Sequence, residues 1–223
     1  GPLPNNNTYL KNGGMGFFTF GGQNIFMTTL ESNLNQYGLL TGEFSPAGYA
    51  IGGGGFSLVN GRYIFGGHGY GLGYPNLQAS GPEIEVSSGG GAFLFGYVIF
   101  NQSRWLIFPT VGFGGMGMSM DIKNQGSQDL QFGDDAILAG TTREYTFGTP
   151  TLEGNLSIKR LISRANGIEE GGFALGVDVG YVLGLSRGNW EEDISEQRVG
   201  NLREGFLEGF YVRLSIGGGG FAR

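Results

Sequence analysis

Apolar residues alternate with small or polar residues along most of this 223-residue chain. A repeat of two residues matches a β-strand, in which successive side chains point to opposite faces of the sheet. No run of 18 apolar residues is present, which argues against a transmembrane helix. The alternation predicts an all-β fold with eight strands, at about 13–22, 47–59, 62–74, 89–100, 104–122, 149–161, 172–186 and 206–220.

The connections between these segments alternate between long and short. The second and third segments are joined by Asn60-Gly61, a strong signal for a two-residue hairpin turn, whereas 123–148 and 187–205 are long and polar. An eight-stranded antiparallel up-and-down barrel would gather the long loops at one end and the short turns with both termini at the other. We predict one such β-barrel domain over residues 1–223, with 1–12 as an N-terminal tail.

One short helix is predicted between the first two strands. In "IFMTTLESNLNQYG", Met27, Leu30, Leu34 and Tyr37 recur at helical spacing, and Gly38 follows where a helix should stop. We expect this helix to cover or plug one end of the barrel.

The two faces of each strand indicate which one meets lipid. In 172–186, one face is large and apolar, and the other is mostly small: Ala174, Gly176, Asp178, Gly180, Val182, Gly184 and Ser186. A face in water would normally carry Lys, Glu, Thr or Gln, whereas small residues suit a narrow barrel interior. We therefore expect the large apolar faces to point outward. Segments 62–74 and 89–100 carry glycine or apolar residues on both faces, so the content of the interior stays open there.

Charged residues on the expected inner faces form a candidate network of Glu153, Lys159, Asp178 and Arg213. An unpaired buried charge costs several kcal/mol, so we expect these residues to pair, for example Asp178 with Arg213, and to fill the lumen. A path for protons or ions through the network is the alternative. A soluble barrel, with its apolar faces turned inward, is a second alternative.

The hexapeptide IGGGGF occurs twice, at 51–56 and 216–221, in a chain with 47 glycines. In a closed barrel the two copies would flank the first strand and form a glycine seam, made of Gly52, Gly53, Gly54, Gly55, Gly217, Gly218, Gly219 and Gly220. Three roles are open. The glycines could allow sharp coiling, leave room for aromatic side chains or a helix, or give a smooth outer face for a lipid chain or another protein.

The composition argues against several functions. Charged residues make up 14% of the chain, against roughly 25% in a typical soluble domain, as expected for a surface that faces lipid. The net charge of −6 argues against a nucleic-acid partner. Cysteine is absent, and the single histidine, His68, lies in no catalytic or metal-binding motif. We expect a packing role for His68, and no catalytic residue, metal or cofactor.

The strand number, loop alternation and face chemistry resemble those of the small eight-stranded barrels of the bacterial outer membrane. The resemblance implies a barrel in contact with the lipid bilayer, with long loops at the cell surface. We expect a non-catalytic protein with a plugged polar lumen, whose loops 123–148 and 187–205 contact a protein partner. The alternative is a soluble or periplasmic barrel that binds an apolar ligand in a glycine-lined cavity. A third hypothesis is an outer-membrane enzyme that uses His68.

Overall fold

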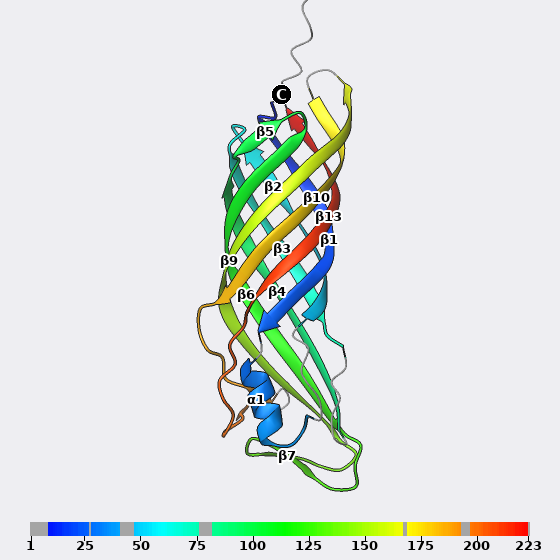
Figure 1. The fold of residues 1–223 in the computed structure, drawn as a ribbon, viewed down its shortest axis with the longest axis vertical. Coiled ribbons are helices and arrows are strands. Elements are labelled where there is room, and N and C mark those ends of the chain that lie inside the picture. The colour runs from blue at the N-terminus through cyan, green and yellow to red at the C-terminus, as the bar shows by residue number, and fades with distance from the viewer. Residues whose placement is uncertain are drawn as a thin grey trace, which may run out of the picture.

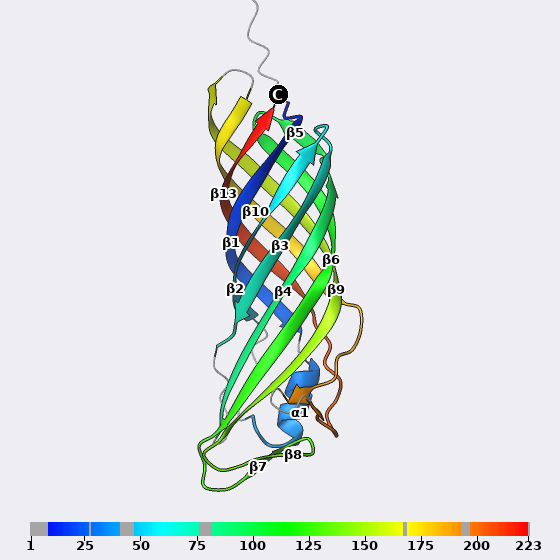
Figure 2. The same cartoon turned by 180° about the vertical axis from the view of Figure 1, so that it is seen from behind.

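Eight long antiparallel strands close into a barrel (Figures 1 and 2) in the computed structural model, which describes residues 9–26, 28–40, 47–75, 82–166, 169–192 and 197–222. The first strand pairs with the last from Asn12↔Ala222 to Phe26↔Glu208, and this pairing closes the sheet. The predicted eight-stranded antiparallel barrel is confirmed. Its strands are β1 (Asn12–Phe26), β2 (Ala47–Val59), β3 (Tyr63–Gly73), β4 (Pro82–Tyr97), β6 (Trp105–Asn124), β9 (Thr142–Asn166), β10 (Glu169–Gly184) and β13 (Glu208–Ala222).

Short elements lie at the two ends of the barrel. The short-turn end holds β5 (Phe100–Gln102), the β2–β3 turn and the C-terminus (Figure 1). Asn60 and Gly61 both have positive φ and form the centre of the turn, in which the Arg62 amide donates to the Val59 carbonyl at 3.1 Å. The opposite end, here called the loop end, holds α1 (Thr28–Gln36), β7 (Leu130–Phe132), β8 (Asp135–Ile137), β11 (Glu191–Glu192) and β12 (Gln197–Arg198).

Two strands begin well before their predicted starts. β4 begins at Pro82 rather than 89, and β9 at Thr142 rather than 149. Residues 82–88 and 142–148 were expected in connecting loops, but in β4 the exposed Glu85 alternates with the buried Ile84 and Val86. A strand that leaves the membrane can carry charges on its outer face. Together with β6, these extensions form a wall that continues past the rest of the barrel (Figure 2).

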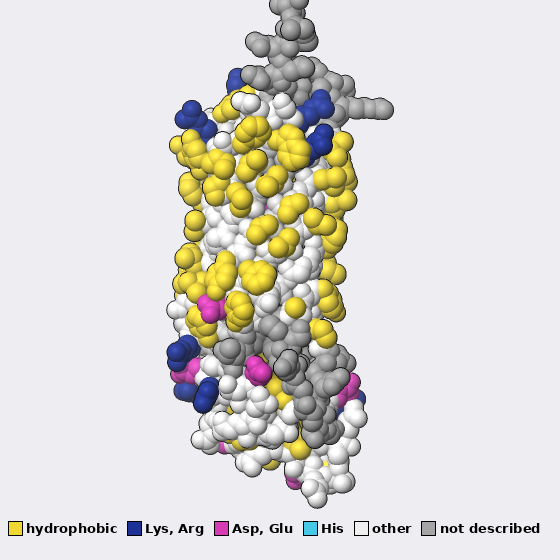
Figure 3. Space-filling view, viewed as in Figure 1, with side chains coloured by type: hydrophobic (Ala, Val, Ile, Leu, Met, Phe, Trp, Pro, Cys, Tyr) yellow, Lys and Arg dark blue, Asp and Glu magenta, His cyan; other side chains and the backbone are white. Residues whose placement is uncertain are grey.

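The outer surface carries a belt of exposed apolar side chains (Figure 3), of which Phe93 is 84% exposed and Phe18 is 75% exposed. A closed barrel satisfies its backbone hydrogen bonds internally, as hydrocarbon demands, and an outward apolar belt is typical of outer-membrane barrels. The belt therefore contacts lipid, and the protein is a bacterial outer-membrane barrel. The soluble alternative is wrong because the large apolar faces of the strands point outward. No helix within the described residues is long and apolar enough to span a membrane.

The interior has three layers. Buried apolar side chains fill the loop end, among them Tyr70, Leu72, Met118 and Trp190, and a second apolar cluster, which includes Phe108, fills the short-turn end. Polar and charged side chains lie between them. The expected polar lumen is therefore correct only for this middle layer. The inner face of β3, which the sequence left open, contributes to both apolar clusters, whereas β4 contributes Ile84 and Val86 to the loop-end cluster.

The predicted helix is present as α1 and covers the loop end of the barrel (Figure 1). Leu30 and Leu34 are buried in the apolar cluster beneath it. The chain leaves the helix at Gly38, whose φ is +67°, and the Leu39 amide donates to the Leu34 carbonyl at 2.9 Å. Met27, also placed on the helix by its spacing, lies outside the described residues.

Candidate functional site

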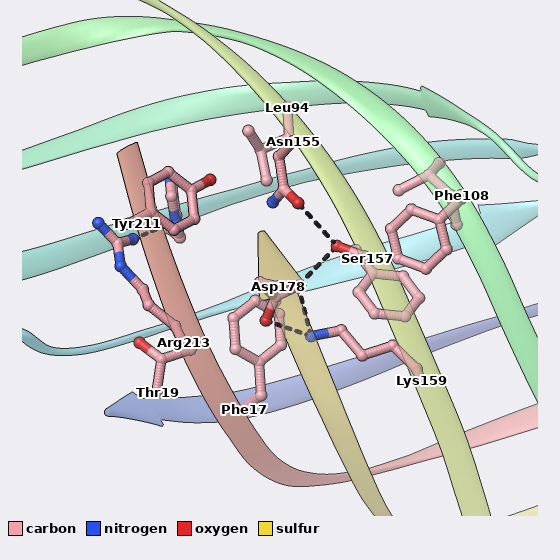
Figure 4. Close-up of a pocket in the computed structure, with 14 residues that line it drawn as sticks. Phe17, Thr19, Leu94, Phe108, Asn155, Ser157, Lys159, Asp178, Tyr211 and Arg213 are labelled. Carbon is pink, nitrogen blue, oxygen red and sulfur yellow. Dashed lines mark hydrogen bonds and ion pairs between the residues drawn. The ribbon is translucent and has the colours of Figure 1, made fainter. Parts of the chain in front are cut away.

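An ion pair lies at the centre of the polar layer. Lys159 Nζ contacts the two carboxylate oxygens of Asp178 at 2.6 and 2.8 Å, and both side chains are nearly buried (Figure 4). Ser157 donates to the same carboxylate at 2.6 Å, and Lys159 donates to Ser215 at 2.6 Å. Hydrogen bonds to both members offset part of the cost of removing the two charges from water.

A second cluster crosses the lumen beside this pair. His68 of β3 and Glu153 of β9, which are not neighbouring strands, meet at 2.9 Å between Nε2 and Oε2. Tyr211 donates to the other carboxylate oxygen of Glu153. Arg213 Nη1 lies 3.4 Å from His68 Nδ1. Since an arginine can only donate, His68 Nδ1 is the acceptor in this contact.

Arg213 is held by aromatic rings and an amide. Its guanidinium lies 3.8 Å from the ring centre of Tyr70 and 4.0 Å from that of Tyr211, and Nη2 donates to Gln23 at 2.5 Å. Such cation–π contacts are strongest where the cation is removed from water. Asp178 and Arg213 are register partners on β10 and β13, but the partner of Asp178 is Lys159. The predicted Asp178–Arg213 pair is wrong.

The structure therefore brings the four predicted lumen residues into one layer, in two clusters. The cavity between them has only about 20 Å³ that can hold the centre of a water molecule, roughly enough for one water. His68 was expected to pack and was not placed in the lumen network, because segment 62–74 carries glycine or apolar residues on both faces and its direction was open. Pairing across the lumen depends on how the strands are staggered, which the sequence does not display.

The glycines of the seam alternate in direction. Gly52, Gly54, Gly217 and Gly219 share the inward face of their strands, and a Cβ on any of them would stand within 3.0 Å of backbone on a neighbouring strand. These glycines permit the close coiling of a small barrel, the first of the three predicted roles. On β13 the outward Gly220 has open space, since a Cβ added there would meet no atom within 4 Å, so it has no such constraint.

Outward glycines also form a row around the barrel. Gly53, Gly69, Gly91 and Gly115 are successive register partners on β2, β3, β4 and β6. They form the floor of an open groove of about 520 Å³ that Phe93 also lines. The groove lies within the apolar belt and therefore faces hydrocarbon. A specific lipid chain or protein on this surface stays a prediction.

The long loops and α1 form one hydrogen-bonded body, here called the loop assembly. Asn33 of α1 donates to the Arg203 carbonyl and accepts from the Arg203 amide, both at 3.0 Å. The Gly200 amide donates to Asp134, which links the β10–β13 loop to the β7–β8 hairpin. Trp190, 1% exposed, packs against Phe147 of β9 with ring centres 4.6 Å apart. The two loops expected to contact partners are thus packed on the barrel wall.

Hydrogen bonds and burial at the loop end shift the pKa values of three side chains. Arg143 donates to Glu192 at 2.8 Å, and this hydrogen bond raises the pKa of Arg143. Burial, supported by a 2.8 Å hydrogen bond to Asp135, raises the pKa of Tyr145. Burial likewise raises the pKa of Tyr74, just after β3, to about 12. All three groups therefore keep their ordinary charge at neutral pH.

No protein-family model and no curated protein matches the sequence. Among solved structures, the chain is similar to the crystal structure of outer membrane protease OmpT from Escherichia coli, with 8% sequence identity and a TM-score of 0.40. The match covers 95% of this chain and 96% of that chain. The expectation of a non-catalytic protein is wrong as an inference from this architecture, because the matching barrel is an enzyme. At this likeness, no activity or residue role is carried over.

Proposed function

We propose that this outer-membrane barrel presents a folded loop assembly at the cell surface, where the assembly binds a partner. The observation that carries the proposal is the mutual packing of the long loops, since the β10–β13 loop forms hydrogen bonds with both α1 and the β7–β8 hairpin. Loops held in one arrangement lose little conformational entropy when they bind, which favours recognition.

The shape of the barrel supports the same function. The wall of β4, β6 and β9 (Figure 2) carries the loop assembly beyond the apolar belt (Figure 3). Two apolar clusters and the polar layer occupy the lumen. A barrel with a filled interior and a raised loop body is better suited to recognition at its surface than to the passage of solutes.

The charge of the loop end favours a basic partner. The described residues of the loop end, in 28–40, 82–88, 119–148, 186–192 and 197–208, include 12 of the 19 acidic residues and 5 of the 13 basic ones. Complementary charge accelerates association and discriminates between partners more than it raises affinity. A partner with a basic surface is therefore the class that this end of the barrel would select.

The test uses the full-length barrel in phosphatidylcholine vesicles and two labelled decapeptides, oligo-lysine and oligo-glutamate. We expect oligo-lysine to bind, and its affinity to fall in 0.5 M NaCl and in a Glu191→Gln/Glu204→Gln variant, which neutralises two exposed carboxylates of the β10–β13 loop. An Asn35→Ala variant changes an exposed, uncharged position of α1 and should bind as the wild type does. Equal binding of the two peptides would refute the charge-based part of the proposal. Steady ion conductance across planar bilayers would refute the filled lumen.

A further inference from the structure

The short-turn end carries a basic rim. Among the side chains that the structure describes at this end, the charged ones are Lys11, Arg62, Arg104 and Arg160. In Figure 3 this rim shows Lys and Arg at the top, above the apolar belt, whereas the visible Asp and Glu side chains lie toward the loop end. Among the described side chains, the charges of the two ends are therefore opposite in sign.

The three arginines are concentrated on one side of the rim. Arg62 precedes β3, and its carbonyl accepts a hydrogen bond at 2.7 Å from Val98, just beyond β4. Arg104 lies in the β5–β6 turn, and Arg160 of β9 is the register partner of Trp105 on β6. Because β3, β4, β6 and β9 are consecutive strands of the sheet, these residues lie on one side of the rim.

Aromatic side chains accompany the arginines on the outer face. Tyr63, Tyr97 and Trp105 are 41%, 44% and 37% exposed. The Tyr63 and Tyr97 rings meet edge to face with centres 5.8 Å apart, and the Arg160 guanidinium lies 5.2 Å from the Trp105 ring centre. Exposed Tyr and Trp at the edge of an apolar belt sit at the level of lipid headgroups. The arginines beside them therefore stand at headgroup depth.

We propose that this collar, made of Arg62, Tyr63, Tyr97, Arg104, Trp105 and Arg160, binds the headgroups of anionic phospholipids in the leaflet at the short-turn end. A guanidinium can donate two parallel hydrogen bonds to a phosphate, and the rings cover the glycerol and upper acyl region. A soluble acidic polymer would be attracted by the arginines alone, and its binding would not require exposed aromatic rings. The aromatic row at the edge of the belt therefore favours a lipid as the occupant.

Trp105 provides a direct reporter of this binding. The chain has two tryptophans, and the other one, Trp190, is buried in the loop assembly and shielded from lipid. The full-length barrel is reconstituted in phosphatidylcholine vesicles that contain a fixed fraction of brominated lipid, either phosphatidylglycerol or phosphatidylcholine. We expect the brominated phosphatidylglycerol to quench Trp105 more strongly. Each basic residue near an anionic surface contributes roughly a fivefold preference at low salt.

The same measurement on variants separates the collar from general charge effects. An Arg62→Gln/Arg160→Gln variant should lose most of the preference, whereas an Arg62→Lys/Arg160→Lys variant should keep much of it. A Lys123→Gln/Arg198→Gln variant, which removes two positive charges at the loop end, should quench as the wild type does. Equal quenching by the two lipids in the wild type would overturn the proposal. A preference that survives the glutamine substitutions would also overturn it.

Discussion

Replacing Asp178 with asparagine should destabilise the barrel strongly, because it leaves the buried Lys159 ammonium without a counter-charge. Lys159 is 3% exposed and contacts Asp178 at 2.6 Å. Removing one partner of a buried ion pair costs about 3–5 kcal/mol. This corresponds to a loss of roughly a hundredfold to several thousandfold in the folding equilibrium constant.

A second substitution identifies the partner. Lys159→Met in the Asp178→Asn background removes the stranded charge and should restore most of the stability. The residual loss should be about 1–3 kcal/mol, because Ser215 loses its hydrogen bond from Lys159. Arg213→Met in the same background should not restore stability. Arg213 makes its own contacts with Gln23, Tyr70 and Tyr211, and these would be lost in addition.

The assay is reversible urea unfolding of the full-length barrel in vesicles, followed by the shift in gel mobility between unheated and boiled samples. With a slope of roughly 1–3 kcal/mol per molar urea, the Asp178→Asn midpoint should fall by about 1–5 M. The reasoning would be refuted if Arg213→Met, rather than Lys159→Met, restored the midpoint. An unchanged midpoint for Asp178→Asn alone would show that the pair does not stabilise the barrel.

Three further predictions concern other parts of the barrel. Gly217→Ala should cost about 1–3 kcal/mol in the same assay, because its Cβ would press on the Gly16 carbonyl and Phe17 backbone, whereas Gly220→Ala in the same glycine run should be neutral. Tyr74 has its pKa raised from 10.0 to about 12 by burial, so its contribution to stability is full below pH 10 and declines as the pH rises to about 12. Tyr74→Phe should therefore flatten the alkaline loss of stability between these pH values, and an unchanged profile would contradict this. Asn33→Ala removes two hydrogen bonds to Arg203 and should speed proteolysis of the β10–β13 loop while leaving the barrel midpoint nearly unchanged; equal cleavage in Asn35→Ala would contradict a specific tie.

The sequence by itself determined the strand count, the direction of the faces and the presence of α1. A side chain's direction in a strand follows from its position along the chain, with a period of two, and needs no knowledge of neighbouring strands. Thus Phe173 and Val177 could be assigned to lipid, and Asp178 to the lumen, before any pairing was known. The outward belt confirms these directions. The turn at Asn60-Gly61 is equally local, because its positive φ angles belong to those two residues.

Only the tertiary structure decided which side chains meet inside the barrel. Contact between His68 and Glu153 spans strands that are not neighbours, and it depends on the stagger of the whole sheet. Asp178 lies opposite Arg213 in register, yet it pairs with Lys159 because the rings of Tyr70 and Tyr211 already hold the guanidinium. The extension of β4, β6 and β9 past the apolar belt also depends on tertiary contacts. These charged strands continue outside the membrane where the loop assembly covers their inner faces, and the loop assembly comes from segments distant in the chain.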